Sequence, residues 1–155
     1  MSEEFMKVIV FQLKEEEYGV PVKYVGSIER MQNITRVPGT PEFVKGVINL
    51  RGVVTPIIDL RERFDLEITE YTESTRIIIV NIADKEVGMI VDSANDVIDI
   101  PESTIEPPPE VVGSVEADYI HGVAKLDKRL LILLNLDKVL SKDELKQIQT
   151  VEGTS

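Results

Sequence analysis

The stretch Phe43-Val-Lys-Gly-Val-Ile-Asn-Leu50 returns later in the chain, in altered form, as Tyr119-Ile-His-Gly-Val-Ala-Lys-Leu126. Gly46 falls on Gly122 when the two stretches are aligned. Both stretches are rich in Val, Ile and Leu, which is typical of strands. A glycine inside a strand pattern marks a bulge or a close approach of another backbone. We therefore expect one strand of the same kind in each half of the chain.

The repeat extends on both sides of this strand. In its front part Glu17–Val22 falls on Glu86–Val91, which aligns Gly19 with Gly88. In its back part Asp59-Leu60 falls on Asn135-Leu136, in the same alignment that matches Gly46 with Gly122. The second copy is seven residues longer in the middle loop that joins these parts. Because each copy alone is of marginal size for folding, the two should pack together. The repeat predicts a two-lobed body with a cleft between the lobes.

Short runs rich in Val and Ile, separated by turn residues, predict the strands. They lie near residues 5–14, 17–22, 24–30, 43–51, 52–59, 76–82, 85–91, 94–100, 119–126 and 129–134. Five short strands with hairpin links in each copy are typical of a small closed barrel, where closure removes exposed edges. The expected fold class is mainly β.

Two short helical segments are expected. Asp59-Leu-Arg-Glu62 predicts a helical turn, and Ser141-Lys-Asp-Glu144 has the pattern of a capping box. A helix should therefore begin near Lys142, so that residues 141–155 form a C-terminal helix and a tail.

Composition disfavours several classes of protein. The chain has 155 residues, no cysteine and a formal net charge of −11. Without cysteine there is no disulfide and no thiolate metal site. The acidic charge disfavours nucleic acid and anionic membrane. Leu130–Leu134 is too short to cross a bilayer, and Met1–Leu13 lacks the basic start of a signal peptide. These features fit a cytoplasmic protein without direct membrane insertion.

Catalytic and cofactor motifs are missing from the sequence. It contains no HExxH, GxSxG, P-loop or dinucleotide pattern. The one histidine, His121, corresponds to Lys45 in the first copy, and we expect it to be a packed or exposed bystander. We therefore expect no enzyme, no metal and no cofactor. Two alternatives stay open: a small barrel that binds nucleic acid, and an enzyme whose carboxylates converge in the fold.

The two copies differ at one tight turn. The first copy has Asn49-Leu-Arg51-Gly52, whereas the second has Lys125-Leu-Asp127-Lys128. Arg51 offers five donors in a planar fork, which suits a carboxylate. That carboxylate belongs either to a partner or to this chain, and residue type alone does not decide between them.

Several motifs together resemble those of the CheW-type chemotaxis coupling protein. They are Glu17-Tyr-Gly19, Pro41-Glu-Phe-Val-Lys-Gly-Val-Ile-Asn-Leu-Arg-Gly52, Pro56-Ile-Ile-Asp-Leu60, Val87-Gly-Met-Ile-Val-Asp92 and Leu131-Ile-Leu133. The resemblance spans about Phe5 to Leu145, essentially the whole chain. The run from Lys45 to Gly52, followed by Pro56–Leu60, is its most specific part.

The resemblance implies a fold and a function. The fold would be two intertwined, SH3-like, five-stranded β-barrel lobes, with the first lobe near residues 5–68, the second near 69–140 and a single domain over 1–155. The function would be that of a non-enzymatic scaffold, recruited to membrane-associated receptor arrays. It would couple the cytoplasmic tips of chemoreceptors to the regulatory domain of the histidine kinase CheA.

The resemblance also implies contact residues. Receptor contact falls on Val25, Ile34, Thr35, Gly46, Arg51 and Val97. Kinase contact falls on the second lobe, within the strands of residues 76–98. Because the apolar residues of these strands alternate between faces, and one face of a small barrel looks outward, we expect Ile77, Ile79, Val87 and Met89 to contact CheA. A second array contact falls on Glu106 and Val111, where this chain lacks the basic and aromatic residues of its relatives. Gly46 is expected where the backbone of a partner comes close.

Overall fold

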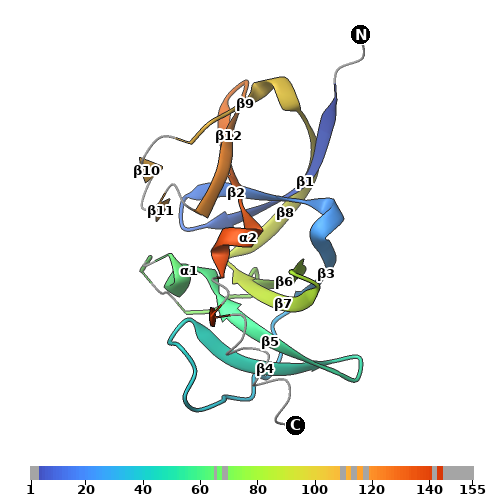
Figure 1. Ribbon diagram of the computed structural model, residues 1–155, viewed down its shortest axis with the longest axis vertical. Helices are drawn as coiled ribbons and strands as arrows, with labels where there is room; N and C mark the ends of the chain where they lie inside the picture. The colour runs from blue at the N-terminus through green and yellow to red at the C-terminus, as the bar shows by residue number, and fades with distance from the viewer. Residues whose placement is uncertain are drawn as a thin grey trace.

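Two stacked β-sheets make up most of the computed structural model, which describes residues 4–64, 66–67, 70–108, 111–112, 115–116, 119–140 and 143–144 (Figure 1). The six-stranded sheet has the order β8 (Ser93–Pro101), β1 (Phe5–Leu13), β2 (Glu16–Pro21), β13 (Arg129–Leu134), β12 (Ile120–Leu126) and β9 (Ile105–Glu106). The five-stranded sheet has the order β3 (Val25–Arg30), β6 (Arg76–Ile82), β7 (Lys85–Val91), β5 (Val53–Asp59) and β4 (Val44–Leu50). We call these the upper and the lower lobe, as they lie in Figure 1. All of the predicted strands are present, so the mainly β class is confirmed.

The short elements lie between the long strands or after them. They are the 3₁₀ turns η1 (Val22–Tyr24) and η2 (Glu102–Thr104), the pair β10 (Val111–Val112) and β11 (Val115–Glu116), and the helices α1 (Leu60–Arg63) and α2 (Leu136–Val139). The helical turn predicted at Asp59–Glu62 is confirmed as α1. Of the predicted C-terminal helix, Asp143 and Glu144 are helical, and the rest of 141–155 lies outside the described residues. No helix among the described residues is long and apolar enough to cross a membrane.

The two lobes are built by exchange of hairpins between the two copies of the repeat. The β1–β2 hairpin of the first copy pairs in parallel with β13 of the second, with Gly19 opposite Leu133. The β6–β7 hairpin of the second copy pairs in parallel with β5 of the first, with Gly88 opposite Ile57. The lobes therefore do not follow the expected division of the chain near residues 68 and 69, because each takes strands from both sides of it.

The repeat itself is confirmed in three dimensions. The alignment of Gly46 with Gly122 also matches strand β4 with strand β12 and helix α1 with helix α2. Each of these strands has a register shift next to its glycine, between Val44 and Gly46 in β4 and between Ile120 and Gly122 in β12. The two glycines thus occupy equivalent bulges, as the sequence predicts.

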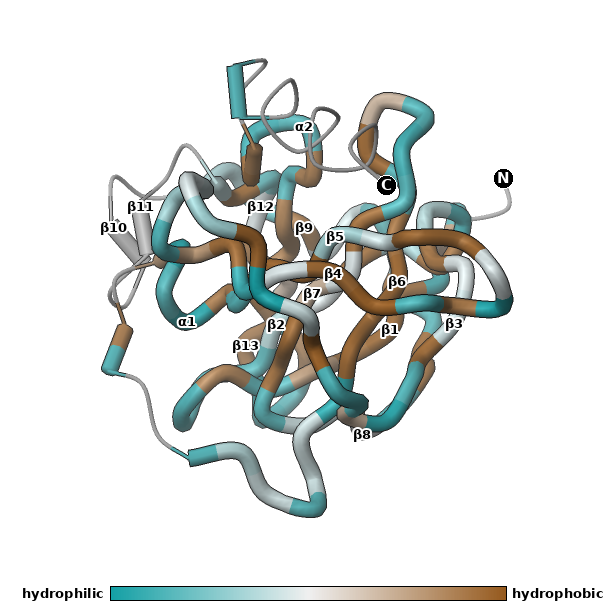
Figure 2. The backbone as a smooth tube through the Cα atoms, turned by 90° about the horizontal axis from the view of Figure 1, so that it is seen from below, coloured by the Kyte–Doolittle hydropathy of each residue, from teal (hydrophilic) through white to brown (hydrophobic). Residues whose placement is uncertain are grey.

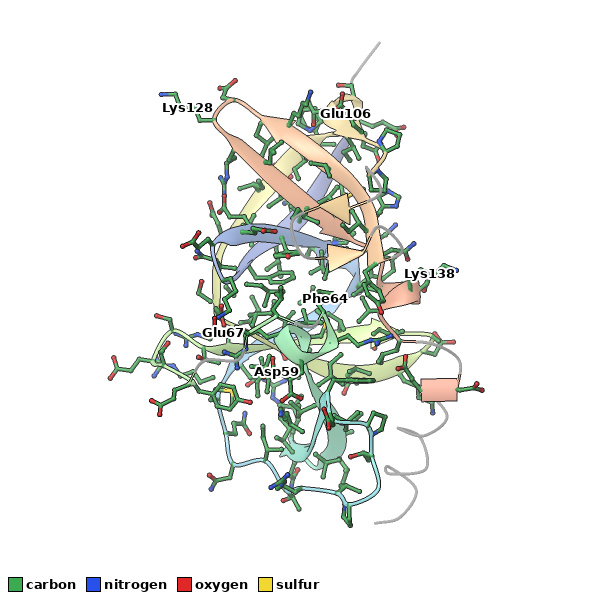
Figure 3. The ribbon with its side chains drawn as sticks, turned by 90° about the vertical axis from the view of Figure 1, so that its left-hand side faces the viewer. Asp59, Phe64, Glu67, Glu106, Lys128 and Lys138 are labelled. Carbon is green, nitrogen blue, oxygen red and sulfur yellow. The ribbon has the colours of Figure 1, made fainter. Side chains whose placement is uncertain are left out.

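Three apolar clusters make up the core, and one of them holds the two lobes together. A small cluster lies inside the upper lobe, and another lies inside the lower lobe. The largest lies between them and takes alternate residues of the same strands, for example Ile78 and Val80 of β6. Phe64, just after α1, lies between the lobes and packs against Tyr18 and Tyr119, with ring centroids 6.4 and 5.2 Å apart (Figure 3).

The central strands are apolar on both faces because both faces are covered. In β6, Ile77 and Ile79 face the cluster inside the lower lobe, while Ile78 and Val80 face the cluster between the lobes. Figure 2 shows the same distribution, with hydrophobic colour along β1 and β6 and hydrophilic colour mainly at turns. This is the reason for the unbroken Ile77-Ile-Ile-Val80 run in the sequence.

Candidate functional site

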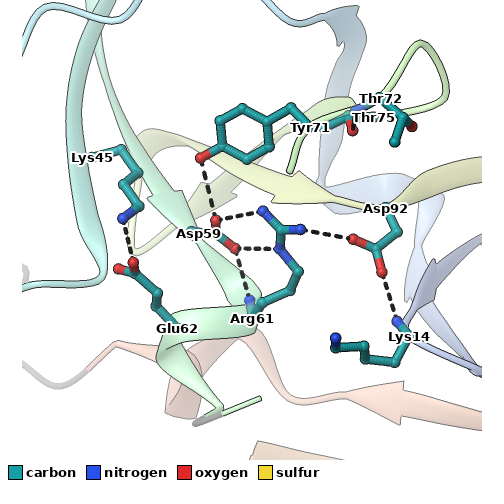
Figure 4. A network of polar contacts seen from close by, with 9 residues as sticks. All are labelled: Lys14, Lys45, Asp59, Arg61, Glu62, Tyr71, Thr72, Thr75 and Asp92. Carbon is teal, nitrogen blue, oxygen red and sulfur yellow. Dashed lines mark hydrogen bonds and ion pairs between the residues drawn. The ribbon is translucent and has the colours of Figure 1, made fainter. Parts of the chain in front are cut away.

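A buried ionic network joins the two lobes (Figure 4). The Arg61 side chain is 1% exposed and donates to both carboxylate oxygens of Asp59, from Nε at 3.1 Å and from Nη2 at 3.0 Å. Its Nη1 donates to Asp92 at 3.3 Å. The other oxygen of Asp92 accepts from the backbone N–H of Lys14, in the β1–β2 turn of the upper lobe, at 2.7 Å. The network therefore joins α1 of the lower lobe to the upper lobe.

The ionisation of the network follows from its contacts. Burial opposes the positive charge of Arg61, but hydrogen bonds and attraction from Asp59 and Asp92 outweigh it, and the pKa of the guanidinium is raised. Burial, and then the Asp59 carboxylate, raise the pKa of the Tyr71 hydroxyl to about 12. Tyr71 donates to Asp59 at 3.3 Å and its ring lies 5.2 Å from the Arg61 guanidinium carbon. Sequence reasoning missed this network, because Asp92 and Lys14, which connect the Asp59–Arg61 pair to the upper lobe, lie far from that pair in the chain.

Three of the predicted receptor-binding residues come together around Gly46. A Cβ on Gly46 would lie 2.0 Å from the carbonyl oxygen of Thr35 and 2.9 Å from Ile34 Cγ2. Thr35 forms a bridge with Val47, with both backbone hydrogen bonds at 2.9 Å. The backbone that comes close to Gly46 is therefore that of Thr35 in the same chain, and the expectation of a partner's backbone there is corrected. Gly46 is buried, whereas Thr35 is exposed.

Arg51 stands at the tip of the β4–β5 hairpin with its side chain 76% exposed. Its backbone is left-handed, with φ of 54°, followed by Gly52 with φ of 86°. Two successive positive φ values are those of a type I′ hairpin turn. The Arg51 Nη2 lies 3.5 Å from a carboxylate oxygen of Glu29 on β3, so the arginine has an ion-pair partner in its own chain. An ion pair so exposed contributes little, and the guanidinium remains accessible.

The remaining predicted receptor residues, Val25 and Val97, lie on edge strands of different lobes. Val25 begins β3 and packs partly against the cluster between the lobes. Val97 lies on β8 and is 52% exposed. The alignment of Gly19 with Gly88 makes Val97 the counterpart of Ile28, which is 41% exposed. Each lobe therefore exposes an apolar residue at the same place on its edge strand.

The predicted kinase-binding face is not exposed in this fold. The side chains of Ile77, Ile79, Val87 and Met89 are between 0 and 1% exposed. Ile77 and Ile79 fill the lower lobe, and Val87 and Met89 fill the core between the lobes. The expectation that one apolar face of β6 and β7 looks outward is wrong, because hairpin exchange places these strands at the centre of the molecule.

The predicted array contact has one described side chain. Glu106 lies on β9, opposite Val123 of β12, and its carboxylate is 3.3 Å from Lys125 Nζ. Because Val123 is the counterpart of Val47, Glu106 holds the position in the upper lobe that Thr35 holds in the lower. Val111 belongs to the short strand β10.

Two hollows stand out on the surface of the described part of the chain. One, of about 800 Å³, lies beside Ile34, where the segment 36–42 faces the ion pair of Lys45 and Glu62. The other, of about 520 Å³, lies beside β1, η1 and the start of α2, and His121 lines it. Among the described residues, no group of three or more His, Asp or Glu side chains is arranged to hold a metal ion.

Comparison with known proteins shows the family. The family model described as the CheW-like domain matches residues 7–144. The chain belongs to the CheW-like domain family. It is similar to the chemotaxis protein CheW of Bacillus subtilis (strain 168), with 50% identity over 137 residues, which are 88% of each chain. It is also similar to the chemotaxis protein CheW of Klebsiella aerogenes, with 38% identity over 92% of this chain and 86% of that one.

A solved CheW structure has the same fold. The crystal structure of the scaffolding protein TtCheW from Thermoanaerobacter tengcongensis superposes with a TM-score of 0.85 and 38% sequence identity. The superposition covers 91% of this chain and 96% of that one. The function that goes with this family is that of a chemotaxis scaffold coupling receptors and CheA, rather than that of an enzyme. The alternative of a nucleic-acid-binding barrel finds no support among these relatives.

Proposed function

We propose that this chain couples the cytoplasmic tips of chemoreceptors to CheA by binding both, without any chemical step. It would work in the cytoplasm as one domain over residues 1–155, recruited to membrane-associated arrays. The observation that carries the proposal is the pair of equivalent lobes with different exposed residues. Arg51 of the lower lobe has Asp127 as its counterpart in the upper lobe. Equivalent lobes with opposite charges at the same turn suit two different partners.

The receptor surface would run from Ile34 and Thr35 along β4 to Arg51, and would include Val25 and Val97. Arg51 would leave Glu29 for a carboxylate on a receptor helix, which its exposure and the 3.5 Å separation favour. Gly46 would act on this surface indirectly, because it lets Thr35 lie against β4. Apolar side chains of a receptor helix would fill the surface beside Val97.

Each lobe would be an SH3-like barrel. In the lower lobe, the Arg51–Glu29 pair and the Thr35–Val47 bridge bring β3 and its extension to β4, at the opposite end of the sheet order. In the upper lobe, Asp96 on the edge strand β8 attracts Arg129 at the start of β13, the fourth strand of that sheet. The contacts of the lower lobe support curling of its sheet until the two edges meet, and we infer the same closure for the upper lobe from the repeat.

The kinase would bind the exposed end of the upper lobe rather than the buried strands β6 and β7. Leu130, at the β12–β13 turn, is 60% exposed, and its counterpart Val54 in the lower lobe is 39% exposed. An exposed apolar side chain on a rigid hairpin suits a partner barrel that brings its own apolar end. The array contact would use Glu106 and Val111 on the same lobe.

One binding experiment tests the proposal. In sedimentation experiments, the wild-type chain is mixed separately with a receptor cytoplasmic fragment and with the CheA regulatory domain. It should form a complex with each. Arg51→Ala should lower receptor affinity about tenfold to hundredfold, since a charge-assisted bond is worth roughly 1.5–3 kcal/mol. Asp127→Ala, at the counterpart position, is the matched control and should leave receptor affinity unchanged.

The kinase assignment has its own pair of variants. Leu130→Asp should weaken binding to the CheA regulatory domain and leave receptor binding intact, and Val54→Asp should leave CheA binding intact. Equal loss of CheA binding in both variants would move the kinase surface elsewhere. Retention of neither partner by the wild-type chain would overturn the coupling function itself.

A further inference from the structure

The hollow of about 520 Å³ has a counterpart in the other copy of the repeat, and that counterpart is filled. The front alignment of the copies places Lys23 on Asp92, and the back alignment places Asn135 on Asp59 and Asp137 on Arg61. The sheet register supports this equivalence, because Gly19 lies opposite Leu133 as Gly88 lies opposite Ile57. Lys23, Asn135 and Asp137 all line the hollow. It is therefore the place that the Arg61 network occupies in the first copy (Figure 4).

The hollow is open because Asp137 has a short side chain where the first copy has a long one. The Arg61 guanidinium fills its space between Asp59 and Asp92, and it is 1% exposed. Asp137 is exposed. The backbone role is the same in both copies, since Asp59 accepts from Arg61 N–H at 2.9 Å and Asn135 Oδ1 accepts from Asp137 N–H at 3.2 Å. The cap of the helix is therefore kept, whereas the group that fills the space is absent.

The walls of the hollow have also changed sign. A group placed like the Arg61 guanidinium would meet the Lys23 ammonium instead of the Asp92 carboxylate. It would meet the amide of Asn135 instead of the Asp59 carboxylate. Because Asn135 Oδ1 already caps α2, its NH₂ is the group left to donate. An ammonium and an amide donor suit a carboxylate.

The rim carries both signs of charge. Lys7, Lys23, Glu102 and Asp137 line it, so the lysines and carboxylates balance. A plain anion would be repelled by Glu102 and Asp137, whereas a ligand with an ammonium beside its carboxylate meets a partner for each charge. Leu133, Leu134 and Leu136 form a buried apolar floor, and the Tyr24 ring is 40% exposed at the rim. Such a floor suits an aliphatic side chain.

We propose that this hollow binds a small zwitterion with an aliphatic side chain, of the class of the free α-amino acids. The ligand carboxylate would lie between Lys23 and Asn135, and its ammonium would face Asp137 and Glu102. Asn81, which also lines the hollow, belongs to β6 of the lower lobe, whereas Asn135 follows β13 of the upper lobe. An occupant would therefore join the two lobes at this place. At the equivalent place in the first copy, the Arg61 side chain joins them.

The test is titration of the full chain with L-leucine, followed by amide shifts in two-dimensional NMR. Two blocked ligands, N-acetyl-leucine and leucinamide, each lack one charge of the zwitterion. We expect leucine to shift the amides of Lys23, Asn135 and Asp137 in the millimolar range, and each blocked ligand to bind at least about tenfold more weakly, the loss of one charge-assisted bond. No shift with leucine, or equal binding of the blocked ligands, would overturn the proposal.

Variants locate the site. Lys23→Met changes an exposed side chain and should weaken leucine binding, while Lys128→Met, at the exposed β12–β13 turn, should not. The triple change Lys23→Asp, Asn135→Asp and Asp137→Arg rebuilds the network of the first copy in the hollow. It should abolish binding and raise the melting temperature, since the new guanidinium takes the place of the ligand. Wild-type binding by Lys23→Met would show that the site is elsewhere.

Discussion

The close approach of Thr35 to Gly46 makes Gly46→Ala a sharp test of the fold. A Cβ at this position would lie 2.0 Å from the Thr35 carbonyl oxygen, and the neighbour is backbone rather than a flexible side chain. The φ of Gly46 is 142°, a conformation that side chains other than glycine rarely adopt. Alanine would therefore impose both a conformational cost and a steric clash.

The magnitude follows from these two costs. The conformational strain is about 1–3 kcal/mol. Relief of the clash requires opening the Thr35–Val47 bridge, whose two hydrogen bonds at 2.9 Å are worth roughly 0.5–1.5 kcal/mol each. Together they predict a loss of about 2–6 kcal/mol, a large share of the roughly 5–15 kcal/mol that stabilises a domain.

The assay is equilibrium unfolding in urea, with Gly52→Ala as the control. Gly52 has a φ of 86°, and a Cβ added there would have no neighbouring atom within 4 Å, so its substitution should cost only strain of about 1–2 kcal/mol. If Gly46→Ala loses no more stability than Gly52→Ala, the contact with Thr35 is not what requires the glycine. Receptor affinity should also be measured on the fraction of the Gly46→Ala protein that is folded. A lower affinity in that fraction would show that the surface is altered, and an unchanged affinity would show that only the stability of the fold is.

Two further predictions concern the Arg61 network. Arg61→Met leaves the Asp59 carboxylate buried without a neutralising positive charge and should cost about 3–5 kcal/mol in urea unfolding. The double variant with Asp59→Asn should recover part of that loss, and equal stability of the two variants would contradict the pairing. The raised pKa of Tyr71, about 12 against 10.0 for a free tyrosine, predicts that the free energy of unfolding falls between pH 10 and 12, because the unfolded chain releases the proton first. Tyr71→Phe should reduce that fall, and an unchanged slope would refute the assignment; part of the fall should remain, since burial also raises the pKa of Tyr18.

The strands and the repeat could be predicted from the sequence because their signals are local. Runs of Val and Ile between turn residues locate the strands, and Gly46 and Gly122 locate the equivalent bulges. The cap at Asp59 likewise predicts α1 from neighbours in the chain. The family motifs extended the prediction to function, because each motif is a run of consecutive residues that can be recognised without the fold.

The exchange of hairpins could not be predicted, because local patterns do not say which strand pairs with which. The run Ile77-Ile-Ile-Val80 was expected to turn one face outward, as it would in a barrel made from consecutive strands. In the folded chain its two faces meet two different cores. The Arg61–Asp92 pair was missed for a similar reason, because its members lie far apart in the chain.

The hairpin exchange bears on how a scaffold of this kind could transmit a signal. Both lobes contain strands from both copies, so neither sheet is complete without a hairpin from the other copy. The largest apolar cluster lies between the lobes, and relative movement of the lobes would have to repack it. A rigid body joined in this way would transmit receptor state by how it is tilted or loaded rather than by opening.

The Arg61 network strengthens one place at the lobe boundary, and the hollow beside Asn135 marks the equivalent place that the chain's own side chains leave open. Any flexing between the lobes should therefore be largest beside Lys23 and Asn135, where an occupant of the hollow would oppose it.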